Sequence, residues 1–400
     1  MGGYNKMKLN ISDKALLSFE KNKYFNLIKE EWKYTNINKF QSIKYQKNSS
    51  NCNNLETIKS KTNKILIINS EIKTAEHSKE IFISNLNNAI KNNSNNCKKI
   101  FNKIIPFENN PNVALNTAYF NNGIFIHIRD NAEIKEPIKL THYLENISPD
   151  IFLNHRIVLS IGKNVSVKFI NEELFNIKSA INTTWEINIG NNSNVEFVNL
   201  ANKYQTSQIL NFGVSLNKNS ILNYIPIDLA GKLIKNSCYF NLNKENSQCY
   251  INGLNILNNN DYIDNFIQIN HNHKHTISNT SFYNLLNNSS TSIFYAKAII
   301  NSIASKAEAY QTNKNLLLSK KSSIHSNPQL EIYNNDVKCS HASTTGEIDK
   351  EALHYLRTRG ISYEESFQLI LNGFINNILE KISTKSVQKQ LQDYIAKNVN

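Results

Sequence analysis

The densest cluster of reactive side chains in the chain is Cys339-Ser340-His341, in which a single serine separates the cysteine from the histidine. Successive side chains of a strand alternate between its faces, so an extended backbone places Cys339 and His341 on the same face. A thiol and an imidazole on one face can bind a soft or borderline metal ion. The pair is incomplete, because a closed metal site needs about four ligands. From the spacing alone, a buried strand cysteine beside a hydrogen-bonded histidine is the more common arrangement.

A run of alternating histidines offers a second set of candidate ligands. His271, His273 and His275 are separated by Asn272 and Lys274, so on a strand the three imidazoles would share one face. Such a face could bind a metal ion, and a solvated polar surface fits the neighbouring lysine and asparagine equally well.

The cysteines give no sign of a disulfide framework or a zinc ribbon. They are odd in number, widely scattered and without a C-x-x-C pair. We expect Cys238 and Cys249, which fall in successive predicted strands, to be small core residues.

The elements that must position these side chains are repeated strand–turn–strand units, which begin at about residue 124. Their first turn residues recur every 26 to 33 residues, and a strand unit with a period of about 20 to 50 residues is typical of a solenoid or a propeller. A propeller blade needs four strands in about 40 residues or more, which these intervals do not allow. We therefore predict a mainly β protein built as a parallel β-helix, with asparagine favoured at its turns. The predicted turns begin at Arg129, Gly162, Gly190, Asn217, Asn243, Asn270 and Asn301.

The N-terminal region, residues 1–105, is predicted to be helical and mixed. An amphipathic pattern runs from Ser12 through Phe25 and Ile28. Trp32 and Tyr34 follow, and we expect them to anchor this arm on the core. The remaining predictions for this region are a polar loop or linker at about 45–63, a strand at 64–69 and helix mixed with loop at 73–101.

The predicted β-helix core spans residues 106–345, and residues 346–400 are predicted to form a C-terminal helical region. Asp349 can cap a short helix that Gly360 ends, and the S-x-x-E spacing of Ser362 and Glu365 fits a capping box. The helix behind it has apolar residues at three- and four-residue steps, and a weaker last helix follows.

The formal net charge of +13 raises the question of nucleic-acid binding. Only four arginines occur and the lysines are dispersed, whereas arginine is the residue that reads bases through paired hydrogen bonds. We therefore predict no specific nucleic-acid binding. No signal-peptide core and no long apolar run occur, so we expect a cytoplasmic protein that does not span a membrane.

The chain has no P-loop, no G-x-G-x-x-G and no nucleophile elbow. Any ATP hydrolysis that serves this protein must then come from a partner. The enzyme alternative is a carbohydrate-active β-helix, which needs clustered acidic and basic groups on the coil wall. No convincing carboxylate pair on adjacent rungs is found, so we predict that the chain is not an enzyme.

Several motifs resemble the SufB/SufD family of iron–sulfur cluster assembly scaffolds. They are QTNKNLLLS at 311–319, PQLEIYNNDVKCSHA at 328–342, GEID at 346–349 and YLRTRGIS at 355–362. Weaker agreement is found in LNTAYF at 115–120 and EPI at 136–138. EEWKYT at 30–35 is similar to the SufD branch, and the cysteine-rich segments expected of SufB are absent. The SufB paralogue and the carbohydrate-active β-helix are the alternatives.

The resemblance implies a right-handed parallel β-helix and a non-catalytic scaffold subunit. Such a subunit pairs with a SufB-like paralogue through the β-helix and binds a SufC-like ABC-type ATPase through the C-terminal helices. It also implies that His341, accompanied by Cys339, lies near the SufB interface and helps to build the nascent cluster. No tightly bound cofactor is expected, only a transient iron–sulfur cluster or iron at that interface. The family commonly has glycine where this chain has Ala342. The residues that we predict to contact the ATPase are Arg357, Arg359, Tyr363, Phe367 and Phe374.

Overall fold

The turns of the chain are built around asparagines with a left-handed backbone. Asn131, Asn164, Asn192 and Asn219 have φ between 55° and 59°, a conformation that asparagine tolerates better than most residues with a side chain. Their amides also form a ladder, since each Nδ2 donates to the Oδ1 of the preceding member over 2.9 to 3.0 Å. The ladder continues to Asn246, and the left-handed conformation continues at His275 and Lys306.

The strands between these turns form a parallel β-solenoid of about eight turns, which confirms the predicted fold class. In this computed structural model the described residues are 11–22, 30–35, 40, 44–45, 57–59, 62–92, 94–120, 123–145, 147, 151–175 and 177–398. The strands of the solenoid are β6 (Ile124–Ile128), β7 (Ile138–Tyr143), β8 (Ile151–Ile161), β9 (Ser166–Leu174), β10 (Ser179–Ile189), β11 (Asn194–Leu216), β12 (Ile221–Leu242), β13 (Gln248–Leu257), β14 (Tyr262–His271), β15 (Ile277–Leu286), β16 (Thr291–Ile300), β17 (Ala307–Leu317), β18 (Ser323–Ile332) and β19 (Val337–Glu347).

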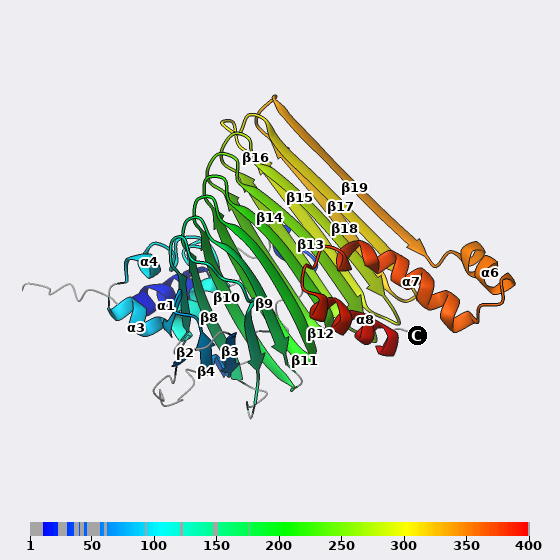
Figure 1. The fold of residues 1–400 in the computed structure, drawn as a ribbon, viewed down its shortest axis with the longest axis horizontal. Coiled ribbons are helices and arrows are strands. Elements are labelled where there is room, and N and C mark those ends of the chain that lie inside the picture. Colours follow the sequence, from blue (N-terminus) through cyan, green and yellow to red (C-terminus); the bar gives the residue numbers. More distant parts are fainter. Residues whose placement is uncertain are drawn as a thin grey trace, which may run out of the picture.

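These strands pair in two parallel ladders, and Figure 1 shows them side by side along the body of the molecule. One ladder runs β6–β8–β10–β11–β12–β14–β16–β18 and the other runs β7–β9–β11–β12–β13–β15–β17–β19. The predicted first turn residues follow the strand ends directly, with one difference. At Asn270 the strand continues to His271, so that turn begins two residues later, at Asn272.

The interior between the ladders is a packed aromatic and aliphatic core. Trp185, Phe197, Phe212, Tyr224 and Phe240 are each 2 % exposed or less. Their rings are stacked, tilted or edge-to-face against one another, and the centroids of Phe212 and Tyr224 are 4.6 Å apart. Burial of each such side chain contributes about 1.5–3 kcal/mol. Cys238 and Cys249 belong to this core, as predicted.

The N-terminal region contains more β structure than predicted. The strand expected at 64–69 is present as β3 (Asn63–Ile68). The stretch predicted as helix mixed with loop begins instead with two strands, β4 (Glu71–His77) and β5 (Ile81–Asn85), which pair antiparallel with β3 and β6. Short β1 (Lys44–Tyr45) and β2 (Thr57–Lys59) are also present, while Phe25, Ile28 and most of the predicted linker lie outside the described residues. The helices of this region are α1 (Ile11–Asn22), the 3-10 helix η2 (Glu30–Trp32), α3 (Leu86–Lys91), α4 (Asn95–Lys98) and α5 (Pro111–Tyr119).

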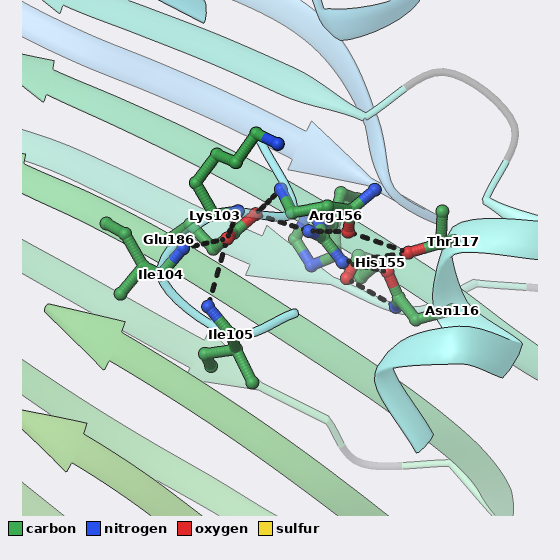
Figure 2. A network of polar contacts seen from close by, with 9 residues as sticks. Lys103, Ile104, Ile105, Asn116, Thr117, His155, Arg156 and Glu186 are labelled. Atoms are coloured by element: carbon green, nitrogen blue, oxygen red, sulfur yellow. Dashed lines mark hydrogen bonds and ion pairs between the residues drawn. The ribbon is translucent and has the colours of Figure 1, made fainter. Parts of the chain in front are cut away.

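A buried ion pair joins the N-terminal region to the solenoid wall (Figure 2). Arg156 of β8 and Glu186 of β10 are both fully buried and bonded to each other. The Glu186 carboxylate also accepts hydrogen bonds from the backbone N–H groups of residues 102–105, at 2.7 to 3.2 Å. Arg156 donates to the Oδ1 of Asn102 over 2.8 Å. The Glu186 carboxylate thus holds the backbone of a loop in which the N–H of Lys103 also donates to the backbone oxygen of Ile100.

The arm that contains Trp32 is fixed on the wall as expected. Trp32 is 5 % exposed. Glu31 accepts hydrogen bonds from the hydroxyls of Ser237 and Tyr239, at 2.6 and 3.0 Å. The hydroxyl of Tyr262 donates to the backbone oxygen of Tyr34.

Three helices follow the solenoid: α6 (Lys350–Thr358), α7 (Tyr363–Leu379) and α8 (Lys385–Asn398). Asp349 caps α6, and Ser362 with Glu365 forms the predicted capping box of α7. Helices α7 and α8 pack their apolar faces on the wall of the solenoid, whereas α6 has no buried residue and extends beyond it (Figure 1). No helix in the described part of the chain is long and apolar enough to cross a membrane.

Candidate functional site at the open end of the solenoid

The last strand, β19, contains both residues of the Cys-x-His pair. It pairs with β17 along one edge, in the register Ala309↔Cys339 and Gln311↔His341. Its other edge pairs with no strand among the described residues. Residues 340–347 are all exposed. The solenoid therefore ends on an open edge, and such an edge has unpaired backbone N–H and C=O groups that another chain can pair with.

Cys339 and His341 lie in the row of side chains that faces the interior of the solenoid. Their neighbours one rung below, Ala309 and Gln311, are buried. Cys339 is half-buried against an alanine-rich end of the core, and His341 is exposed. The pair thus points the same way, as the strand alternation predicts, but it is uncovered because no strand follows β19 in the described part of the chain.

The other wall of this opening is β18. The hydroxyl of Ser343 on β19 donates to the hydroxyl of Ser326 on β18 over 2.8 Å, which ties the two ladders together at their ends. Below it, Nε2 of Gln311 donates to the backbone oxygen of Gln329 over 3.2 Å. These cross-links hold the end of the solenoid in shape around His341.

Burial raises the pKa of the Cys339 thiol above its usual value, and a backbone hydrogen bond at Ala309 opposes this in part. Cys339 is therefore a neutral thiol at neutral pH and becomes a ligand only if a metal ion or a positive group displaces its proton. Among the described residues no group of three or more His, Cys, Asp or Glu side chains could hold a metal ion. Cys339 and His341 can supply two ligands, and the rest would have to come from outside the chain.

Ala342 follows His341 at the position where the family resemblance leads us to expect glycine. The residue lies inside β19 and is not among those with positive φ. An alanine fits such an extended backbone without strain, so the substitution leaves the strand intact.

The second predicted set of ligands is not assembled, and the prediction that the three histidines share a face is wrong. Strand β14 ends at His271, and His273 and His275 lie in the turn that follows. The ring of His271 is buried between the hydroxyls of Thr276 and Ser278, each at 2.8 Å. Burial lowers its pKa to about 4. The alternating sequence pattern runs past the end of the strand, into a turn where it no longer determines which way the side chains point.

The five predicted ATPase contacts divide into two groups. Arg357, Tyr363 and Phe367 lie together where α6 meets α7, with Tyr363 stacked on Phe367 at 6.2 Å and the guanidinium of Arg357 6.0 Å from the Tyr363 ring. Arg359 is nearby on the α6–α7 connection and packs over Tyr355. Phe374 instead turns toward the solenoid and contacts Tyr283. A groove of about 290 Å³ beside the first group is lined by Leu317, Leu318, Ser319, Lys320, Glu347, Ile348, Lys350, Leu353, Tyr363 and Phe367.

Sequence reasoning missed the polar groups inside the solenoid. Lys203 is fully buried between the carboxylates of Glu173 and Asp228, each 3.2 Å from its Nζ. Nε2 of His142 donates to Oδ1 of Asn171 over 2.7 Å, and burial lowers the pKa of this histidine to about 4. The strand pattern gave no signal for them, because the interior row was expected to be apolar.

The chain matches two family models. The SufBD core domain of the SUF system for FeS cluster assembly matches residues 144–374, and the SufBD protein N-terminal region matches residues 5–140. Among curated relatives, the chain is 26% identical to an iron–sulfur cluster assembly SufBD family protein of Synechocystis sp. over 299 residues, 70% of this chain and 65% of the relative. It is 32% identical to the iron–sulfur cluster assembly protein SufD of Escherichia coli over 41% of this chain and 38% of the relative. It is 27% identical to SufD of Bacillus subtilis over 72% of this chain and 66% of the relative.

The matched stretch spans less than two thirds of the length of each of these relatives. The core model nevertheless covers more than half of the chain. The chain belongs to the SufBD family of the SUF system for iron–sulfur cluster assembly.

Proposed function

We propose that this member of the SufBD family is a SufD-like scaffold subunit, which pairs with a SufB-like paralogue and binds a SufC-like ABC-type ATPase. The observation that carries the proposal is the position of Cys339 and His341 on the last strand of an uncapped solenoid. Two ligands on an open rung suit a site that a second subunit completes. The family match favours this proposal over the carbohydrate-active β-helix.

Pairing with the paralogue would use the end of the solenoid. The free edge of β19 can continue a sheet into another chain. Apolar side chains lie exposed at the C-terminal end of β18, where Ile332 is 45 % exposed and the following Tyr333 is 63 % exposed. Both features favour burial against a partner that presents a similar edge.

His341 would be the contribution of this chain to the nascent cluster, with iron or the cluster as cargo rather than as a resident cofactor. A neutral imidazole ligates through one ring nitrogen while an acceptor holds the other. The remaining ligands would come from the paralogue. A site divided between two chains releases its cargo more easily than a closed one, which suits a scaffold.

The ATPase would dock on the projecting end of the C-terminal region. Helix α6 buries none of its side chains within the chain, and Tyr355 and Tyr363 are 58 % and 49 % exposed. Aromatic and arginine side chains beside an apolar groove are the residues that most often carry binding energy at protein interfaces. Phe374 is withdrawn from this proposal as a direct contact, because it packs on the solenoid.

The test is His341→Ala in the assembled three-protein complex. We expect cluster formation to fall at least tenfold, on the scale of a lost ligand or positioning contact, while the melting temperature and ATPase activity stay near those of the wild type. The matched control is His325→Ala, an exposed histidine on the neighbouring strand β18. Cys339→Ser should have a milder effect, because a strand cysteine is more often packing than ligand.

Two outcomes would contradict the proposal. Cluster formation at the wild-type rate with His341→Ala would remove this residue from the mechanism. Loss of cluster formation in step with loss of complex stability would instead show that His341 acts only as a structural residue.

A further inference from the structure

A buried glutamine lies directly below His341. Gln311 of β17 is opposite His341 in the register of the ladder and is 3 % exposed. Neighbouring strands are about 4.8 Å apart, and the two side chains occupy the same interior row. The amide of Gln311 is therefore within reach of the imidazole above it.

The two ends of the Gln311 amide have different surroundings. Its Nε2 donates to the backbone oxygen of Gln329 over 3.2 Å. This carbonyl needs a donor, so the contact fixes which end of the amide is nitrogen. Its Oε1 is buried and has no hydrogen-bond partner. The amide is thus oriented, with its acceptor end unsatisfied.

The other amides of this row are satisfied. Asn313 donates to the backbone oxygen of Phe282 over 3.2 Å. Asn315 donates to the Oδ1 of Asn313 over 2.8 Å and to the backbone oxygen of Thr344 over 3.0 Å. Within the described residues of β17, β18 and β19, the Oε1 of Gln311 is the one buried side-chain polar atom without a partner. A buried acceptor left in this state is costly.

In the described part of the chain, His341 lacks a hydrogen-bond acceptor for its ring, which is what Gln311 could supply. No hydrogen bond to its ring occurs among the described residues, and its ring is exposed above Gln311. A histidine that ligates a metal almost always donates its other ring N–H to a carbonyl, carboxylate or water. The nearest residue below it in the row offers such an oxygen.

We propose that Gln311 is a positioning residue, whose Oε1 accepts a hydrogen bond from one ring N–H of His341 and leaves the other ring nitrogen free to ligate. The contact fixes the tautomer and orientation of the imidazole. Its use in cluster assembly rests on the function proposed for His341, whereas the contact itself does not. An ordered water at Oε1 is the competing arrangement, and it leaves the tautomer of His341 independent of Gln311.

The experiment is nuclear magnetic resonance of the full chain labelled with ¹⁵N-histidine, without partner proteins and at pH 8. The two ring nitrogens of His341 report its tautomer. We expect one dominant tautomer in the wild type and a shift to a mixture in Gln311→Met, which keeps the chain length and removes the acceptor. Gln311→Glu keeps an acceptor and should restore the single tautomer. Gln268→Met, on the outward row of β14, is the control.

Gln311→Asn provides a second variant if the methionine protein fails to fold, because it withdraws the acceptor by one methylene and keeps the amide. It should also yield a mixture of tautomers. An unchanged tautomer ratio in the folded variants overturns the proposal, and the competing water then accounts for Oε1.

The rate of cluster assembly in the reconstituted complex tests whether the contact between Gln311 and His341 is used in assembly, separately from whether the contact exists. We expect Gln311→Met to lower the assembly rate about tenfold, with unchanged complex formation, and Gln311→Glu to recover most of it. A tautomer that changes while assembly stays at the wild-type rate supports the contact and refutes its use in assembly, whereas the role of His341 itself is decided by His341→Ala. A tautomer that does not change refutes the contact, whatever His341→Ala does.

Discussion

Replacing Glu186 by glutamine should loosen the N-terminal region from the solenoid wall. The carboxylate neutralises Arg156 and accepts the backbone N–H groups of residues 102–105. Glutamine removes the negative charge, and its NH₂ group replaces one of the two carboxylate oxygens that accept from these donors. Arg156 stays buried, and the attraction of Glu186 no longer opposes the effect of burial, which lowers its pKa. Removing one partner of a buried ion pair costs about 3–5 kcal/mol, and we expect this range for Glu186→Gln.

The assay has a global and a local measurement. Denaturant unfolding gives the loss in the free energy of unfolding. Hydrogen exchange gives the free energy of opening for the amides of Lys103, Ile104 and Ile105, and we expect it to fall by a similar amount. The matched control is Glu308→Gln, which breaks a more exposed ion pair with Lys338 and should cost less than about 1 kcal/mol.

A double variant separates charge from packing. Arg156→Met with Glu186→Gln removes both charges and keeps a side-chain acceptor for the N–H groups of residues 102–105, so we expect it to be more stable than Glu186→Gln alone. If Glu186→Gln costs less than about 1 kcal/mol and leaves exchange at residues 102–105 unchanged, the ion pair does not hold the N-terminal region and the reasoning fails.

Three further predictions concern pH, the turns and the ATPase contact. Burial lowers the pKa of His142 and of His271 to about 4. The unfolded chain therefore binds more protons below pH 6.5, and the free energy of unfolding should fall by up to about 3 kcal/mol per histidine between pH 6.5 and 4; a titration in which stability stays flat over this range contradicts it. Asn192→Ala should cost about 1–2 kcal/mol because it forces a left-handed alanine and breaks the ladder, and Asn192→Gly should cost less; equal midpoints in denaturant would refute this. Tyr355→Ala with Tyr363→Ala, which are 58 % and 49 % exposed, should weaken ATPase capture at least tenfold at unchanged melting temperature, since exposed aromatic anchors contribute more than about 1 kcal/mol each; normal capture excludes this surface. Deleting the whole C-terminal region is a poorer test, because α7 and α8 also cover the apolar wall of the solenoid.

Local patterns predicted most of the solenoid and the caps of its helices. Strand alternation and turn residues act over a few positions, so they identified the repeat, the asparagine turns and the shared face of Cys339 and His341. The capping box at Ser362 was also predictable, because its two hydrogen bonds link residues only three positions apart. The same local rule misplaced His273 and His275, since alternation loses its meaning where a strand ends.

The sequence by itself determined a β-helix with helical ends, the family and the residue pair most able to do chemistry. Only the tertiary structure decided that β19 is the last rung, that Gln311 lies under His341 and that Lys203 is buried between two carboxylates. The physical reason is distance along the chain. These contacts join residues about one solenoid turn apart or more, and their partners are set by register and by where the coil stops. A linear pattern specifies which face a side chain takes, and the stacking of rungs specifies what it meets there.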